Sequence, residues 1–220
     1  DWLAAELLRN GGSVKAMHRL ILSSNAYQQA AIKEAAKEKA DPGNELFVRR
    51  LPKRLEGEAI RDSILAVSGK LDSTLYGPSV REESSDRRSI YLRVKRSQLM
   101  NGMVSFDQPE PLVSQGIRPT TTVAPQALIL MNNPQVRACA RAFADRVTAA
   151  NAKDAAVTEL LKQAYAMALG RPPSEDELEA AGAFIHEQTG GEPNRWPAAS
   201  NAFAGFCQVL FETNEFAYLP

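Results

Sequence analysis

Apolar side chains recur every three or four positions along most of the chain, which is the spacing of one face of an α-helix. Eight segments follow it: 1–9, 14–24, 55–71, 125–131, 134–147, 157–168, 175–189 and 196–213. The sequence therefore predicts an all-α fold with roughly half of its residues in helix, well above the usual third.

Helix-boundary signals agree with this spacing. Gly11 and Gly12 suit the left-handed position that ends a helix, and Gly170 closes the segment 157–168 in the same way. Ser174 and Glu177 have the S-x-x-E spacing of a capping box, in which each residue's side chain binds the other's backbone N–H. These residues predict where the helices on either side begin and end.

One segment, 89–96, alternates between apolar and polar positions, as a half-buried strand does. Apolar side chains fall on one side and the aromatic and basic ones on the other: Ile90, Leu92 and Val94 against Tyr91, Arg93 and Lys95. Basic residues here have two interpretations. They protect an edge strand from aggregation, or they hold an anionic sugar or a nucleic-acid strand.

Residues 97–123 form a long segment broken by proline and glycine. Loops of this length inside a domain are uncommon and are often functional. Polar residues cluster in and beside it: Asp107, Gln115, Arg118, Thr121, Thr122, Gln126, Asn132 and Asn133. We expect residues 97–133 to form any functional surface, with Arg88 and Tyr91 close by. The alternative is that these side chains only hold the loop on the helices.

The predicted architecture is a single bundle-like helical domain over residues 1–220, with one long irregular loop region and at most a short β element. Opening helices occupy 1–72, the strand and loop region 73–123, and a second helical part 124–220. The helical spacing begins at the first residue. We therefore expect the chain to be cut from a larger protein, with its first helices missing.

Charge and hydropathy limit the classes of partner. Lys and Arg total 26, as do Asp and Glu, so the net charge is zero. Bulk binding to nucleic acid or to an anionic membrane needs a positive surplus, so neither is expected as a partner. No apolar run reaches the roughly 20 residues that a membrane-spanning helix requires.

The metal-binding residue types are sparse. The two histidines, His18 and His186, lie far apart and have no zinc-ligand spacing. Cys139 and Cys207 sit among apolar neighbours, which favours two buried free thiols over a disulfide. The sequence predicts neither a metal site nor a cofactor in this segment.

Carboxylates are the only plentiful acid–base groups. Glu58 and Asp62 share a helix face, and Asp107 lies in the long loop. A carboxylate pair can hydrolyse a glycosidic bond, which makes these three the candidate catalytic residues. The competing interpretation is a face of ion pairs, with Arg54 and Arg61 as partners.

Several motifs together resemble one protein family. They are D-W-L-A at 1–4, S-V-K-A-M-H-R-L-I at 13–21, R-L-E-G-E-A-I-R-D at 54–62, R-S-I-Y at 88–91, F-D-Q-P at 106–109, T-T-V-A-P-Q-A-L at 121–128, L-M-N-N-P at 130–134, A-L-G-R-P-P at 168–173 and N-E-F at 214–216. The chain resembles the planctomycete-type domain of unknown function 1553. That resemblance implies the C-terminal domain of an exported multidomain protein, outside the cytoplasm and associated with a c-type cytochrome segment. It supplies no catalytic residues.

Two functions remain open at this point. The first is a non-catalytic structural or interaction domain whose partners are other domains of the same protein. The second is an enzyme domain that acts on polysaccharide through carboxylates. An enzyme requires a cleft where Glu58, Asp62 or Asp107 converges with groups such as Arg88, Tyr91 or Gln126. A structural domain separates these carboxylates into individual ion pairs.

Overall fold

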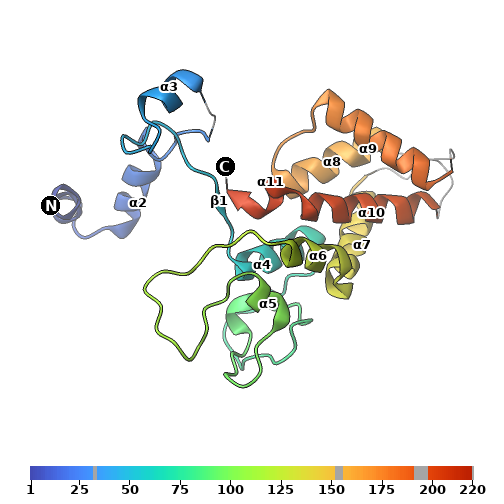
Figure 1. The fold of residues 1–220 in the computed structure, drawn as a ribbon, viewed down its shortest axis with the longest axis horizontal. Helices are drawn as coiled ribbons and strands as arrows, with labels where there is room; N and C mark the ends of the chain where they lie inside the picture. Colours follow the sequence, from blue (N-terminus) through green and yellow to red (C-terminus); the bar gives the residue numbers. More distant parts are fainter. Residues whose placement is uncertain (32–33, 152–155, 191–197, 220) are drawn as a thin grey trace. The chain divides into compact units, whose positions relative to one another are not determined.

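The computed structural model describes residues 1–31, 34–151, 156–190 and 198–219. The chain forms two compact units, with the boundary between Lys53 and Arg54. Within the described residues it contains eleven α-helices and one two-stranded sheet, and 55% of the chain is helical (Figure 1). The predicted all-α class is confirmed. No helix in the described part is long and apolar enough to cross a bilayer.

The first unit contains three short helices, α1 (Trp2–Arg9), α2 (Val14–Leu22) and α3 (Ala35–Ala40). Ser13 caps α2, as its hydroxyl accepts a hydrogen bond from Ala16 N at 3.3 Å. Met17 is the one buried residue of α2, and α1 has none. This unit therefore keeps much of its apolar surface exposed.

The second unit contains the remaining elements. They are β1 (Lys53–Arg54), which crosses the boundary, then α4 (Gly57–Ser68), the 3-10 turn η1 (Ser89–Tyr91), α5 (Asn101–Ser105), α6 (Ala124–Asn132), α7 (Pro134–Ala149), α8 (Val157–Leu169), α9 (Glu175–Gln188), α10 (Ala198–Glu212), α11 (Asn214–Ala217) and β2 (Tyr218–Leu219). The helix predicted over 55–71 is shorter in the structure, and the first two residues of the segment 196–213 lie outside the described residues.

The core of the second unit is built around α10. Figure 1 shows α10 running between α8 and α9 on one side and α6 and α7 on the other. The rings of Phe143 on α7 and Phe211 on α10 stack with their centroids 5.7 Å apart, and both are fully buried. Burial of these large side chains supplies the main driving force for packing the helices.

The strand predicted over 89–96 is wrong. Ser89–Tyr91 forms η1, and the following residues make only isolated bridges, such as the one between Val80 and Leu92. Ile90, which the alternation would bury, is 76% exposed. Ser89 is bound by Asp62 of α4, and the backbone of Tyr91 and Arg93 pairs only with Val80, so the alternation corresponds to no buried sheet face.

Candidate functional site

Arg61 on α4 organises the segment that follows the helix. Its side chain is only 9% exposed and donates hydrogen bonds to backbone carbonyls across a turn. Nη2 and Nε bind Glu83 O at 3.0 and 3.2 Å, Nη1 binds Arg87 O at 2.9 Å, and Nη2 also binds Ser85 O. Burial lowers the pKa of this guanidinium from its ordinary value. Arg61 is therefore a buried tether for residues 83–87.

Asp62 lies next to Arg61 and holds the following turn. Its Oδ1 accepts hydrogen bonds from both the backbone N and the hydroxyl of Ser89, each at 2.7 Å. Two guanidinium groups lie near the carboxylate: Arg61 Nη1 at 3.5 Å and Arg88 Nε at 3.7 Å. The candidate residues Asp62 and Arg88 thus belong to one network, and its visible effect is to fix η1 on α4.

Asp107 forms a second, separate network. One carboxylate oxygen accepts hydrogen bonds from Arg54 Nη2 at 2.5 Å and from Thr121 N at 2.8 Å, and the other accepts from Thr121 Oγ1 at 2.8 Å. Burial raises the pKa of this carboxyl, but the hydrogen bonds from Thr121 and the charges of Arg54 and Arg118 outweigh it and lower the pKa overall. Asp107 is therefore held in its ionised form.

Arg118 connects the long loop to the start of α4. Its Nη2 lies 2.9 Å from Glu58 Oε2, and its Nη1 lies 3.3 Å from Glu56 Oε2. Its Nε donates a hydrogen bond of 2.8 Å to Asp107 O. Arg118 therefore pairs with Glu58 while binding only the backbone of Asp107.

Gln126 and Thr122 fix the end of the same loop. The Gln126 side chain is buried, and its Nε2 donates to Ser105 O at 3.0 Å and to Thr121 O at 3.1 Å. The hydroxyl of Thr122 and Tyr218 Oη lie 2.9 Å apart in a hydrogen bond. The expectation that polar side chains pin this loop on the helices agrees with these bonds.

The remaining candidates lie elsewhere. The Tyr91 ring stacks under the guanidinium of Arg87 at 3.8 Å, and its Oη accepts from Tyr76 N. Asn133 caps α7 by accepting from Gln135 N at 2.8 Å. Asn132 donates to a carbonyl one turn earlier in α6. The structure therefore gathers Glu58, Asp107, Arg118, Thr121 and Gln126 in one cluster and places the other candidates in separate local contacts.

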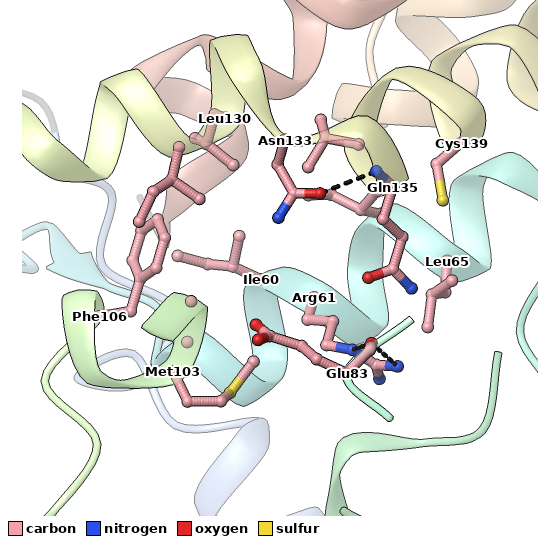
Figure 2. Close-up of a pocket in the computed structure, with 15 residues that line it drawn as sticks. Ile60, Arg61, Leu65, Glu83, Met103, Phe106, Leu130, Asn133, Gln135 and Cys139 are labelled. Atoms are coloured by element: carbon pink, nitrogen blue, oxygen red, sulfur yellow. Dashed lines mark hydrogen bonds between the residues drawn. The ribbon is translucent and has the colours of Figure 1, made fainter. Parts of the chain in front are cut away.

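A small cavity lies between α4, α5, α6 and the start of α7 (Figure 2). Its walls are mostly apolar, with Ile60, Phe106 and Leu130 among them, and the amide of Gln135 lies at its edge. Gln135 Nε2 is buried and has no hydrogen-bond partner among the described residues. The volume of about 50 Å³ is room for a few water molecules. A sugar ring does not fit there.

A much larger pocket, of about 640 Å³, is open to solvent between residues 81–83 and 93–101. Its lining includes three basic side chains: Arg81, Arg93 and Lys95. Two of these basic residues, Arg93 and Lys95, lie in the segment whose alternation suggests an anion-binding role, whereas the candidate binding residues near it are Arg88 and Tyr91. The alternation of basic and apolar residues over 89–96 was the signal that points to this pocket, although the strand it predicted is absent.

The described residues include no group of three His, Cys, Asp or Glu side chains arranged to hold a metal ion. A family model described as Protein of unknown function (DUF1553) matches residues 1–185. The chain belongs to this family. No curated protein and no solved structure matches it significantly. Membership in DUF1553 confirms the resemblance noted from the motifs and leaves the biochemical role to be argued from the site.

Proposed function

We propose that this DUF1553 chain is a non-catalytic structural or interaction domain of an exported, cytochrome-associated protein. The observation that carries the proposal is that each of the three candidate carboxylates is already engaged by groups of the chain itself, although Arg118 links Glu58 to the backbone of Asp107. Asp62 binds Ser89, Asp107 binds Arg54 and Thr121, and Glu58 lies against Arg118. Each carboxylate holds a loop against α4 or closes an ion pair.

Acid–base catalysis on a glycosidic bond needs two carboxyl groups that face one substrate, one of them protonated at the working pH. Asp107 has a lowered pKa and is a poor proton donor near neutrality. Asp62 directs one oxygen at the backbone and hydroxyl of Ser89. These contacts favour the interaction domain over a polysaccharide-cleaving enzyme that uses these residues.

The setting of the domain is proposed from family resemblance. An extracytoplasmic location, partners among other domains of the same protein, and association with a c-type cytochrome segment all follow from that resemblance. This segment is proposed to carry no cofactor of its own, so any haem belongs to another part of the protein. The sequence of the full-length gene tests this setting directly, through its leader and its neighbouring domains.

The non-catalytic role is tested by measuring activity and stability together. The wild-type chain is incubated with neutral and acidic polysaccharides while new reducing ends are assayed. Thermal melting of Asp62→Asn and Asp107→Asn is recorded in parallel. We expect no product from the wild type and lower melting temperatures for both variants. Product that disappears in a variant with wild-type melting would overturn the proposal.

A further inference from the structure

The large open pocket is assembled by short backbone bridges. Val80 pairs with Leu92: Val80 N donates to Tyr91 O at 2.9 Å, and Arg93 N donates to Val80 O at 2.8 Å. Arg81 follows Val80 and Arg93 follows Leu92, so this parallel pairing brings the two arginines next to each other. Gln98 N donates a hydrogen bond of 3.0 Å to Lys95 O and closes a turn. This turn adds the side chains of Lys95 and Gln98 to the pocket lining.

A side chain of α4 also holds the backbone of the pocket wall. Arg61 binds the carbonyls of Glu83 and Ser85, so the backbone that carries Arg81 is tethered to α4. A pocket whose backbone is already held loses little conformational entropy when a ligand binds. The backbone of this part of the lining is therefore held in place before any ligand arrives.

The three basic side chains of the pocket are not engaged by other side chains of the described residues. Arg81, Arg93 and Lys95 form no ion pair and no side-chain hydrogen bond with the described residues, in contrast to Arg61 and Arg118. Several positive charges gathered at one pocket attract anions.

Two carboxylates, Glu82 and Glu83, also line the pocket, and they leave an excess of one positive charge. Figure 2 shows that the Glu83 side chain turns toward Ile60, at the smaller cavity. It packs so closely on Gly102 that a Cβ there would lie 2.0 Å from Glu83 Oε1. The Glu83 carboxylate thus packs against Gly102, and Glu82 remains on the wall with the three basic residues.

The size and lining select the kind of anion. The volume of about 640 Å³ lies in the range of small-molecule sites, about 300–1,000 Å³. The amides of Gln98 and Asn101 provide both donors and acceptors for hydroxyl groups. No aromatic ring is among the lining residues, so nucleic-acid bases find no stacking platform. A hydroxylated ligand with a negative charge fits this lining best.

We infer that the pocket between residues 81–83 and 93–101 binds an acidic sugar, with Arg81, Arg93 and Lys95 holding its carboxylate or sulfate group and Gln98 and Asn101 its hydroxyls. The inference deepens the proposed function, because it names a ligand class for a domain that binds without reacting. The inference rests on the proposed non-catalytic role, because the acidic sugar would be a substrate and not a bound ligand if the site catalysed a reaction.

Calorimetric titration of the full chain tests the inference. The probes are a galacturonic acid trimer, a sulfated disaccharide, an uncharged trisaccharide, inorganic sulfate and a single-stranded oligonucleotide. We expect saturable binding of a carboxylated or a sulfated sugar, and the two probes distinguish which group is held. Binding should weaken as salt rises, because exposed charges are screened. The uncharged sugar should not bind.

Substitutions locate the binding to this pocket. Arg81→Ala, Arg93→Ala and Lys95→Ala should each weaken binding of the acidic sugar by about fivefold, the upper range for exposed ion pairs. Arg96→Ala is the matched control, because Arg96 is an exposed basic residue of the same segment that does not line the pocket. It should bind as the wild type does. All four variants should melt normally.

Three results would overturn the inference: no binding of either acidic sugar, equal weakening by Arg96→Ala, or tighter binding of sulfate alone or of the oligonucleotide. The proposed function fails in a different way. If the bound acidic sugar is cleaved or modified, the pocket is supported as a sugar site while the non-catalytic role is rejected. Product analysis of the titrated samples separates the two failures.

Discussion

Asp62 and Ser89 lie 27 positions apart in the chain, yet Oδ1 of Asp62 accepts two hydrogen bonds from Ser89, from its backbone N and its hydroxyl, both at 2.7 Å. Hydrogen bonds to a charged acceptor are among the stronger ones in proteins. The contact fixes the start of η1 against α4. In place of the strand predicted over 89–96, the structure has η1 held by Asp62, followed by isolated bridges such as the one between Val80 and Leu92.

Asp62→Asn should destabilise the chain by about 1–3 kcal/mol, because the neutral amide removes the negative charge that strengthens a largely buried pair of hydrogen bonds. Chemical denaturation followed by circular dichroism measures the change. Glu110→Gln is the control, since Glu110 is exposed and should change stability by less than about 0.5 kcal/mol. Equal stability of the two variants would contradict a structural role for Asp62.

Two glycines should respond to alanine in opposite directions. A Cβ at Gly57, the first residue of α4, would lie 2.6 Å from Phe106 Cβ, so Gly57→Ala should destabilise the chain by about 1–3 kcal/mol. Gly182 lies inside α9 with nothing within 4 Å of its Cβ position. Gly182→Ala should stabilise by about 0.5–1 kcal/mol through helix propensity. Thermal melting gives both signs, and a stabilising Gly57→Ala would be inconsistent with this packing.

Glu177 should make stability depend on pH in the acid range. Hydrogen bonds from Arg171 and from Ser174 N lower the pKa of this carboxyl from 4.5 to about 2. A lowered folded-state pKa adds stability above the unfolded-state pKa and loses it as the pH falls through the folded-state value.

The melting-temperature difference between the wild type and Glu177→Gln should therefore be constant above about pH 5 and shrink toward zero by about pH 2. The difference should be modest, because both Glu177 and Arg171 are about a third exposed and solvent screens the pair. A difference that does not change between pH 7 and pH 2 would rule out this coupling.

Both cysteines should resist thiol reagents in the folded chain. Cys139 and Cys207 are fully buried and free, and burial raises the pKa of each thiol. Native protein should show almost no reaction with a thiol-specific dye, and denatured protein should show both thiols. Detection of a disulfide in the native protein would contradict the structure.

The helical framework was predictable because its signals are local. The S-x-x-E spacing of Ser174 and Glu177 forms the capping box, with Ser174 Oγ accepting from Glu177 N at 3.2 Å. Gly170 ends α8 in the left-handed conformation. Apolar residues of the helical segment predicted over 134–147, such as Phe143 and Val147, are fully buried in α7. Periodicity and capping depend on neighbours within four residues, which the sequence displays directly.

The polar networks were less predictable because they join distant segments. Arg61 stands in a run of charged residues, and nothing local indicates that its guanidinium is buried under the carbonyls of 83–87. Arg54 and Asp107 are 53 positions apart, so their contact depends on how the long loop folds back. The basic pocket likewise depends on the bridge between Val80 and Leu92, and the segment around Val80 has no periodic signal that would predict this pairing.

The most direct test of the central claim is the free energy of unfolding of Asp107→Asn, measured against the wild type by chemical denaturation. If the Asp107 carboxylate holds the loop through Arg54 and Thr121, the substitution should lower the free energy of unfolding by about 1–3 kcal/mol, because these donors then face a neutral amide. An unchanged free energy of unfolding would contradict the account, since Asp107 would then be free for another role.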